Sequence, residues 1–325
     1  MTKSLRSSPH HGRESFSAPR TRTSTSASPS ALFSRAEGRA AHSAPLARLL
    51  FLLLYFLPLA TYAGDDFGIW SEATIQKDIT KKFSVDASLG FRAEDNLQRV
   101  ARWDLSASLA YKPLGFLTLA ASYTFIYGRG GQSADVNYKN KTDDDGNLVA
   151  NGYNVDHGFW RSRHRASFDI TGKLKAGRFE FSLRERYQYT HYVATSTTRD
   201  RYRDELPSSM LDAYTGDTWQ YNGQTFTSFE QASKSKAAKD KHFLRSKLQA
   251  EYNIRHCPLT PFVSFEFHND MSDGFALDKS RLTVGTEWKV TKKHRLDFAY
   301  VFQHAQDDDA DGNLHAISIG YKFKF

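Results

Sequence analysis

The last eleven residues, His315 to Phe325, read HAISIGYKFKF, and this stretch decides the fold class. Successive side chains point to opposite faces of a β-strand, so the period of two predicts a strand with two different faces. One face is small or basic. The other is apolar or aromatic with a leading histidine, and the chain ends on it: His315, Ile317, Ile319, Tyr321, Phe323 and Phe325.

The same alternation recurs along most of the chain from residue 67 onward. Most of these alternating runs are about as long as the terminal eleven residues, which is sufficient to cross a bilayer at the tilt of a barrel strand. We therefore predict an all-β fold, a transmembrane antiparallel up-and-down β-barrel. The expected strands are 67–79, 83–94, 103–112, 116–127, 159–171, 178–191, 242–254, 261–268, 280–290, 295–304 and 314–325.

The connections between these segments alternate between short turns and longer polar loops. The two longest connections are 128–158 and 193–241. Outer-membrane barrels have short periplasmic turns and long external loops, so we assign the ends of the barrel in this way. Within 193–241, Asn222-Gly223 lies between alternating large residues and predicts a small external hairpin.

The strand tally is eleven, whereas single-chain bacterial barrels have an even number. We expect 10–12 strands and prefer 12. Either a twelfth strand lies within one of the two longest loops, or the segment 67–79 is not an ordinary barrel strand, because its alternation is the least regular.

The N-terminal region differs from the rest in composition. Residues 1–45 are rich in Ser, Arg, Ala, Pro and Thr and predict a low-complexity, disordered extension. Residues 46–63 place Arg48 before the apolar run LLFLLLYFLPLATYA, which ends in small residues at Thr61 and Ala63. This pattern predicts a signal peptide cleaved after Ala63, with residues 64–325 forming a barrel in the bacterial outer membrane.

Composition excludes several other classes. Mean hydropathy is −0.57, too polar for a helical membrane protein. Residues 1–63 hold eight of the 44 basic and two of the 36 acidic residues, which leaves 36 and 34 for the rest, so nucleic acid is not an expected partner. Cys257 is the only cysteine and forms no internal disulfide, and we expect no cofactor.

The face opposite the apolar one is crowded with charge. A small barrel has just enough interior for side chains to fill it, and charges confined there are expected to pair. We interpret them as a salt-bridge network that fills the lumen; the alternative is a narrow anion-preferring channel along the arginine stripe at 161, 163 and 165. The predicted lumen residues are Arg92, Glu94, Arg161, Arg163, Arg165, Arg184, Arg186, Arg245, Lys247, Glu251, Glu266, Arg281 and Glu287.

Other motifs suggest further functions. Ser162 and His164 share the outward face, as in lipid hydrolases of the outer membrane, but no third residue completes a catalytic group, so we predict no enzyme. Asp307, Asp309 and Asp311 resemble the first half of a calcium loop and lack its terminal Glu. Aromatic residues among amides in the external loops suggest binding of a glycan, a lipid or a partner protein.

Two resemblances extend this interpretation. Tyr321, Phe323 and Phe325 resemble the C-terminal signal that the barrel-assembly machinery recognises, which implies this machinery and outer-membrane lipids as partners. The segments Gly68–Glu72, Gly90–Arg92, Arg184–Tyr187 and Ser280–Trp288, together with the terminal YKFKF, resemble the domain-of-unknown-function family 2490. That resemblance implies a barrel in a Gram-negative outer membrane and brings no known activity.

Overall fold

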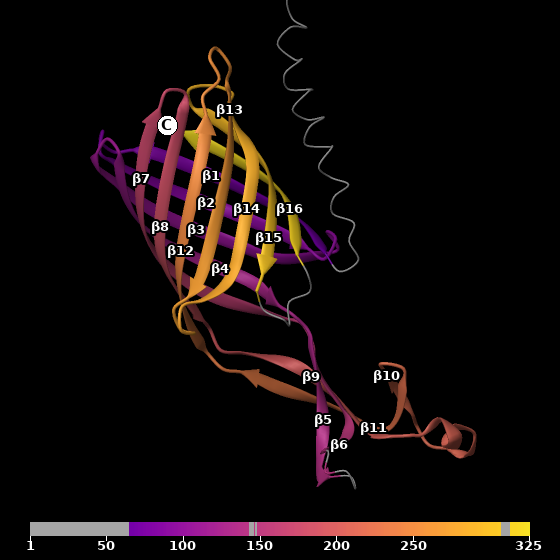
Figure 1. Ribbon diagram of the computed structural model, residues 1–325. Helices are drawn as coiled ribbons and strands as arrows, with labels where there is room; N and C mark the ends of the chain where they lie inside the picture. Colours follow the sequence, from indigo (N-terminus) through magenta and orange to yellow (C-terminus); the bar gives the residue numbers. More distant parts are fainter. Residues whose placement is uncertain (1–64, 143–145, 147, 307–312) are drawn as a thin grey trace, which may run out of the picture. The chain divides into compact units, whose positions relative to one another are not determined.

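A closed β-barrel forms the main body of the chain (Figure 1). The computed structural model describes residues 65–142, 146, 148–306 and 313–325, and eleven strands within them form the ring. In chain order the barrel strands are β1 (Asp66–Asp78), β2 (Phe83–Glu94), β3 (Arg99–Leu114), β4 (Leu117–Gly130), β7 (Phe159–Ala176), β8 (Phe179–Tyr192), β12 (Lys239–Tyr252), β13 (Leu259–Asp270), β14 (Ala276–Lys289), β15 (His294–Ala305) and β16 (Leu314–Lys324).

Every one of these strands overlaps a predicted segment, so the predicted all-β barrel is confirmed. The period-two pattern located the strands because one face of each is mostly apolar and the other mostly polar. The predicted N-terminal extension and signal peptide lie outside the described residues. Among the residues that the structure describes, no helix is long and apolar enough to cross a membrane.

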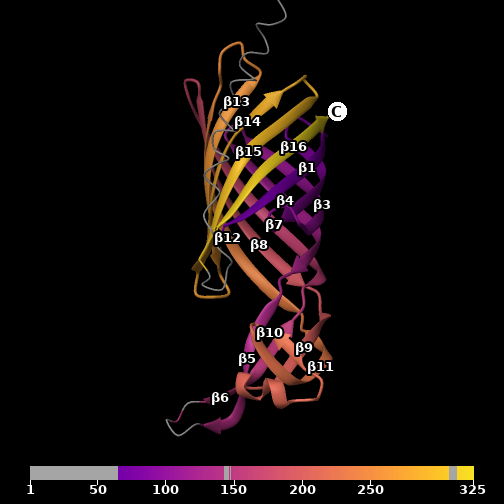
Figure 2. The same cartoon turned by 90° about the vertical axis from the view of Figure 1, so that its right-hand side faces the viewer.

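The ring closes through a parallel pair. β1 and β16 run in the same direction, in register from Asp66 opposite Leu314 to Gln76 opposite Lys324, whereas the other ring neighbours are antiparallel. An odd number of strands cannot alternate direction around a closed ring, so one parallel contact is required. Eleven lies within the predicted range, but the preference for twelve was wrong, and β1 is a full member of the barrel (Figure 2).

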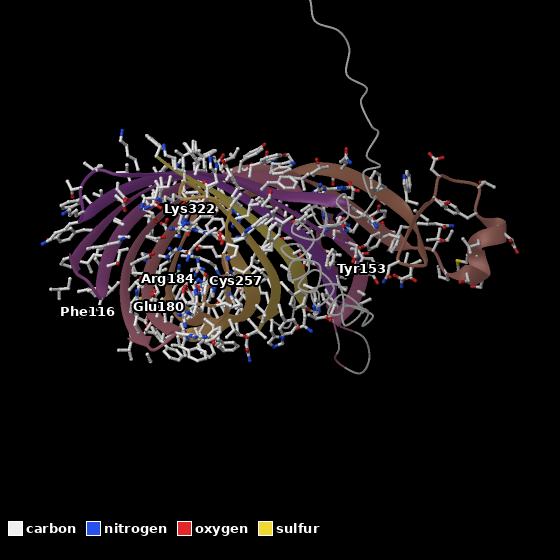
Figure 3. The ribbon with its side chains drawn as sticks, turned by 90° about the horizontal axis from the view of Figure 1, so that it is seen from above. Phe116, Tyr153, Glu180, Arg184, Cys257 and Lys322 are labelled. Carbon is white, nitrogen blue, oxygen red and sulfur yellow. The ribbon has the colours of Figure 1, made fainter. Side chains whose placement is uncertain are left out.

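The barrel is apolar outside and polar inside. Leu105, Leu183 and Leu248 point outward and are 58%, 51% and 58% exposed. Figure 3 looks along the barrel and shows Arg184 inside the ring of strands, with Phe116 on its outer side. This arrangement is the reverse of a soluble β-sandwich, whose apolar face is covered by protein.

Outward aromatic residues gather towards both ends of the barrel. At the end with the short turns, Phe83 stacks on Tyr111 with ring centroids 4.6 Å apart. At the end with the long loops, Tyr127 stacks on Trp160 at 4.9 Å. Each pair joins neighbouring strands, so these contacts also stabilise the sheet.

The two longest loops form a second sheet, which the sequence analysis did not predict. Its order is β10-β11-β9-β6-β5, and none of the five joins the ring, so no twelfth barrel strand lies there. Connections of two residues link it to the barrel at four places: β4 to β5, β6 to β7, β8 to β9 and β11 to β12. We call it the loop sheet: β5 (Ser133–Thr142), β6 (Leu148–Asp156), β9 (Thr195–Glu205), β10 (Trp219–Tyr221) and β11 (Gln224–Lys236).

A 3-10 helix at Ser208–Ala213 lies between β9 and β10. The hairpin predicted at Asn222-Gly223 is confirmed as the turn between β10 and β11. Both residues have positive φ, 48° and 74°, as a two-residue hairpin turn of this kind requires.

The parallel closure can be tested by a disulfide across the seam between β1 and β16. Ser71 lies opposite Ile319, so a chain with Ser71→Cys, Ile319→Cys and Cys257→Ser should form an internal disulfide on mild oxidation, seen as a mobility shift on a denaturing gel. The matched control replaces Phe323 instead of Ile319. That offset of four residues separates the pair by roughly 13 Å, and no bond should form. Equal cross-linking of both pairs, or of neither, would contradict the observed register.

Candidate functional site in the barrel lumen

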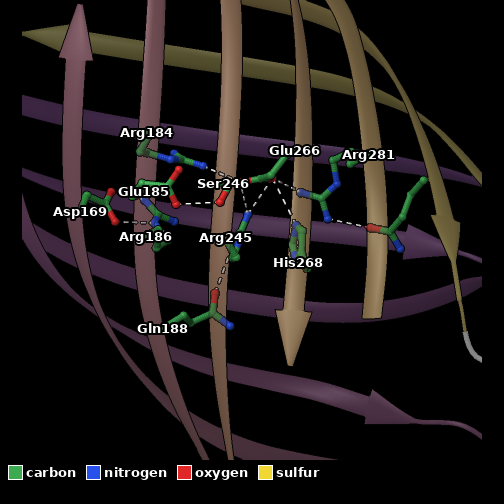
Figure 4. Close-up of polar contacts among 11 residues, drawn as sticks. Asp169, Arg184, Glu185, Arg186, Gln188, Arg245, Ser246, Glu266, His268 and Arg281 are labelled. Carbon is green, nitrogen blue, oxygen red and sulfur yellow. Dashed lines mark hydrogen bonds and ion pairs between the residues drawn. The ribbon is translucent and has the colours of Figure 1, made fainter. Parts of the chain in front are cut away.

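Glu266 lies at the centre of the densest charge cluster in the lumen (Figure 4). Its carboxylate accepts hydrogen bonds from Arg184 Nη2 at 2.6 Å and from Arg245 Nη2 at 2.9 and 3.0 Å, and Arg281 Nη1 lies 3.5 Å away. The four residues come from β8, β12, β13 and β14, which are neighbours in the ring. Glu266 is only 4% exposed although it faces the lumen, so side chains fill the space around it.

The cluster extends to both sides through further hydrogen bonds. Arg186 donates to both carboxylate oxygens of Asp169 at 2.6 Å, a bidentate geometry that holds the two side chains in one orientation. Arg245 Nη1 donates to Gln188 at 3.0 Å, and Arg281 Nη2 donates to Gln303 at 2.6 Å. These bonds join β7, β8, β12, β13, β14 and β15 along one wall of the lumen.

Trp70 connects this wall to the opposite side of the closing seam. Two guanidinium groups lie over its ring: the Arg92 group is 3.8 Å from the ring centroid, and the Arg281 group is 4.8 Å away. Trp70 is on β1 and Arg281 on β14, with β15 and β16 between them in the ring. The side chains therefore meet across part of the lumen and narrow it.

Two cavities in the lumen have opposite charge. The basic cavity, about 370 Å³, is lined by nine Arg or Lys residues and two carboxylates; Arg92, Arg163, Arg165 and Lys239 are among the nine. The acidic cavity, about 290 Å³, is lined by three carboxylates, Glu251, Glu287 and Asp297, and by one cation, Lys247. The basic cavity lies nearer the loop end of the strands and the acidic cavity nearer the turn end.

The predicted lumen residues thus fall into groups that partly overlap. The Glu266 cluster contains Arg184, Arg245 and Arg281, with Arg186 beside it; the basic cavity is lined by Arg92, Glu94, Arg163 and Arg165 and also by Arg245 and Arg281; the acidic cavity is lined by Lys247, Glu251 and Glu287. Arg161 has a different role. It donates to the main-chain carbonyls of Tyr192 at 3.2 Å and Val193 at 2.6 Å, and to that of Ala237, where the loop sheet joins the barrel.

Several residues in the lumen were missed by the sequence analysis. Asp169 lies on the inward parity of β7 and was identifiable by counting in steps of two from Arg165. Trp70 lies in the least regular predicted segment. Tyr192 and Lys239 fall at strand ends, where the alternation alone does not determine which way a side chain points.

The calcium candidates Asp307, Asp309 and Asp311 lie outside the described residues. Within the described residues, no group of three or more acidic, His or Cys side chains could hold a metal ion.

A second ionic cluster lies in the loop sheet. Asp156, 2% exposed, accepts hydrogen bonds from Arg199 Nε and, at 2.6 Å, from Lys236 Nζ. The three residues come from β6, β9 and β11. The hydrogen bond from Arg199, assisted by the Lys236 ammonium, lowers the pKa of Asp156 to about 2.

The fold and the lumen define a closed β-barrel with a charged interior. Comparison with protein families gives a match to the model described as protein of unknown function (DUF2490) over residues 67–313, and the chain belongs to this family, as its motifs suggested. No curated protein matches the chain. Among solved structures it is similar to the β domain of the Bordetella autotransporter BrkA, with a TM-score of 0.44 and 11% identity over 76% of this chain and 85% of that one.

Replacing Glu266 should destabilise the barrel strongly. Glu266→Gln leaves three guanidinium groups without their shared carboxylate, and loss of one partner of a buried ion pair costs about 3–5 kcal/mol. Urea unfolding of the refolded protein in detergent measures the loss. Glu287→Gln is the matched control: Glu287 pairs with Arg295 at 3.1 Å but is more accessible, so about 1 kcal/mol or less is expected. Equal losses would show that Glu266 has no special role.

The loop sheet should open at low pH. The pKa of Asp156 is lowered in the folded state, so its contribution, about 2 kcal/mol, is present above pH ~4 and is lost as the pH falls towards 2. Hydrogen exchange of β6, β9 and β11, corrected for intrinsic rates, should accelerate over this range. Asp156→Asn should show fast exchange at every pH, whereas Glu230→Gln, which removes an exposed pair with Arg201, should not.

Proposed function

We propose that this protein is a non-enzymatic β-barrel of the bacterial outer membrane whose own side chains close its lumen. The observation that carries the proposal is the inverted burial: leucines on the outer face are more than half exposed, while Glu266 in the interior is 4% exposed. A hydrocarbon surround makes the apolar outer face favourable, and pairing with opposite charge offsets the cost of burying charges in the filled interior.

Polar groups on the outer face support a membrane location. In lipid, polar atoms must find partners within the protein. The outer face meets this need by pairing tyrosine hydroxyl groups with histidine Nδ1 atoms on neighbouring strands. The pairs are Tyr123 with His164 at 2.7 Å, Tyr187 with His242 at 2.8 Å, Tyr321 with His294 at 2.8 Å, and Tyr300 with His315. The outward carboxylate of Glu185 likewise accepts a hydrogen bond from Ser246 at 2.7 Å.

The same contacts argue against catalysis by Ser162 and His164. His164 Nδ1 is engaged by the Tyr123 hydroxyl, and the imidazole also packs on Phe125 with centroids 5.6 Å apart. A general base must reach the nucleophile, and these contacts hold the ring towards β4. His164 is therefore better explained as part of the polar pairing on the outer face.

The binding function would lie in the loop sheet, at the end of the barrel that faces the cell exterior in the proposed orientation. Its aromatic side chains form a connected group: Tyr202 stacks on Tyr221 at 4.9 Å, and Trp219 stacks on Phe229 at 5.9 Å. Aromatic faces beside arginine and amide groups suit contacts with glycans, lipid headgroups or a partner protein.

A second candidate is a small solute channel, favoured by the opposite charges of the two cavities. An open pore tends to separate positive from negative charge along its axis, whereas a plug mixes them. This lumen has both: the two cavities separate the charges, and the Glu266 cluster mixes them. The Glu266 cluster and the contact of Trp70 with Arg281 narrow the path, which is why the closed barrel is the first proposal.

Planar-bilayer recording of the refolded protein tests the closed lumen. The wild type should show no stable, sizeable conductance, and Trp70→Ala, which removes the ring that Arg92 and Arg281 contact, should raise the open current. A stable wild-type conductance that shifts when Arg163 and Arg165 are changed to Glu would overturn the proposal in favour of the channel.

A further inference from the structure

We propose that the basic cavity binds a small organic anion that carries a phosphate group, of the size and chemistry of a sugar phosphate. The cavity lies inside the ring towards its loop end and is lined by residues from most of the barrel strands. Such a ligand would be held within the lumen whether or not the lumen conducts.

The cavity contains more positive charge than its carboxylates balance. Five of its nine cations pair with carboxylates: Arg102 with Asp104, Lys241 with Asp270, Lys279 with Asp278, and Arg245 and Arg281 with Glu266. The other four have no carboxylate oxygen within 4.0 Å among the described residues: Arg92, Arg163, Arg165 and Lys239. Among the described residues that line the cavity, Glu94 is the one other carboxylate that can offset them.

Aromatic rings and neutral groups hold these four cations in place. Arg92 lies on the ring of Trp70, while Arg163 and Lys239 lie 5.0 and 5.2 Å from the centroid of the Tyr192 ring. Arg165 Nε donates to the Thr190 hydroxyl at 3.2 Å, and Arg163 Nη2 donates to the Arg129 carbonyl at 3.2 Å. The groups are thus oriented without being neutralised.

This arrangement is unfavourable for an empty structural plug. A cation–π contact recovers less than an ion pair does, and like charges in a confined space repel. The Glu266 cluster, two of whose arginines also line this cavity, shows that the lumen can place a carboxylate among three arginines. Cations that remain unpaired beside a cavity therefore indicate that the balancing charge comes from a ligand.

The charge and size of the cavity define the ligand. Guanidinium groups bind phosphate through paired N–H donors, and a phosphate monoester carries nearly two negative charges at pH 7. A volume of about 370 Å³ lies at the small end of ligand pockets. Trp70, Tyr192 and Phe243 give the wall apolar surface for the organic part of the molecule. The acidic cavity towards the other end of the lumen would repel the same ligand.

Isothermal titration of the refolded full-length protein in detergent tests the proposal with glucose 6-phosphate as the probe. Glucose 6-phosphate should bind and raise the unfolding temperature, whereas glucose should do neither. Arg92→Gln and Arg165→Gln each remove a cation that has no carboxylate partner, and each should weaken binding at least tenfold. Raising the salt concentration should weaken it too.

Lys247→Gln is the matched control. Lys247 is also a lumen cation with no carboxylate oxygen within 4.0 Å in the part of the chain that the structure describes, but it lines the acidic cavity, so the affinity should not change. Absence of binding at millimolar glucose 6-phosphate, equal binding of glucose, or equal weakening by Lys247→Gln would overturn the proposal. Unfolding temperatures without ligand separate folding defects from binding defects. If Arg92 were purely structural, Arg92→Gln would unfold at a lower temperature than the wild type, and glucose 6-phosphate would still raise that temperature by as much as it does in the wild type.

Discussion

Charge confined inside the ring of strands is the constraint on which the rest of the structure depends. The outer face carries most of the apolar side chains, so the charged residues on the opposite parity are confined to the lumen, where a charge without a partner is costly. Glu266 meets this requirement for three arginines, and Asp169 meets it for Arg186. Because these pairs join neighbouring strands, the same contacts also fix the position of the strands relative to one another.

The sequence alone predicted the barrel well because the alternation of side chains is a local property. A strand such as β8 shows its outward face in Phe179, Phe181 and Leu183 without reference to any other part of the chain. The way the ring closes is a property of the whole chain, since it depends on whether β1 meets β16 directly. The rule of even strand number predicted twelve strands. Instead, β1 pairs directly with β16 in parallel from Asp66 to Gln76, and the ring closes with eleven.

For the candidate site, the sequence likewise predicted which face of a strand a residue lies on but not which residue it pairs with. Counting in steps of two placed the arginines of β7 and β8 on one face, but the choice of partner depends on register between strands distant in sequence. Arg184 and Glu266 are 82 residues apart and meet because β8 pairs with β12 and β12 with β13. The loop sheet was missed for a different reason: its strands carry few apolar residues on either face, so their alternation is weak except at the Asn222-Gly223 turn.

The parallel seam also separates the two ends of the barrel-forming chain. Asp65 contacts Asn313 and His315 at the end with the loops, whereas the Phe325 amide donates to Gln76 at the end with the turns. A barrel with an even number of strands brings both of its ends to the same side. In the orientation proposed above, a peptide tag placed just before Asp65 would be displayed to the cell's surroundings, and one placed after Phe325 would face the periplasm, so the two ends of one chain report on two compartments.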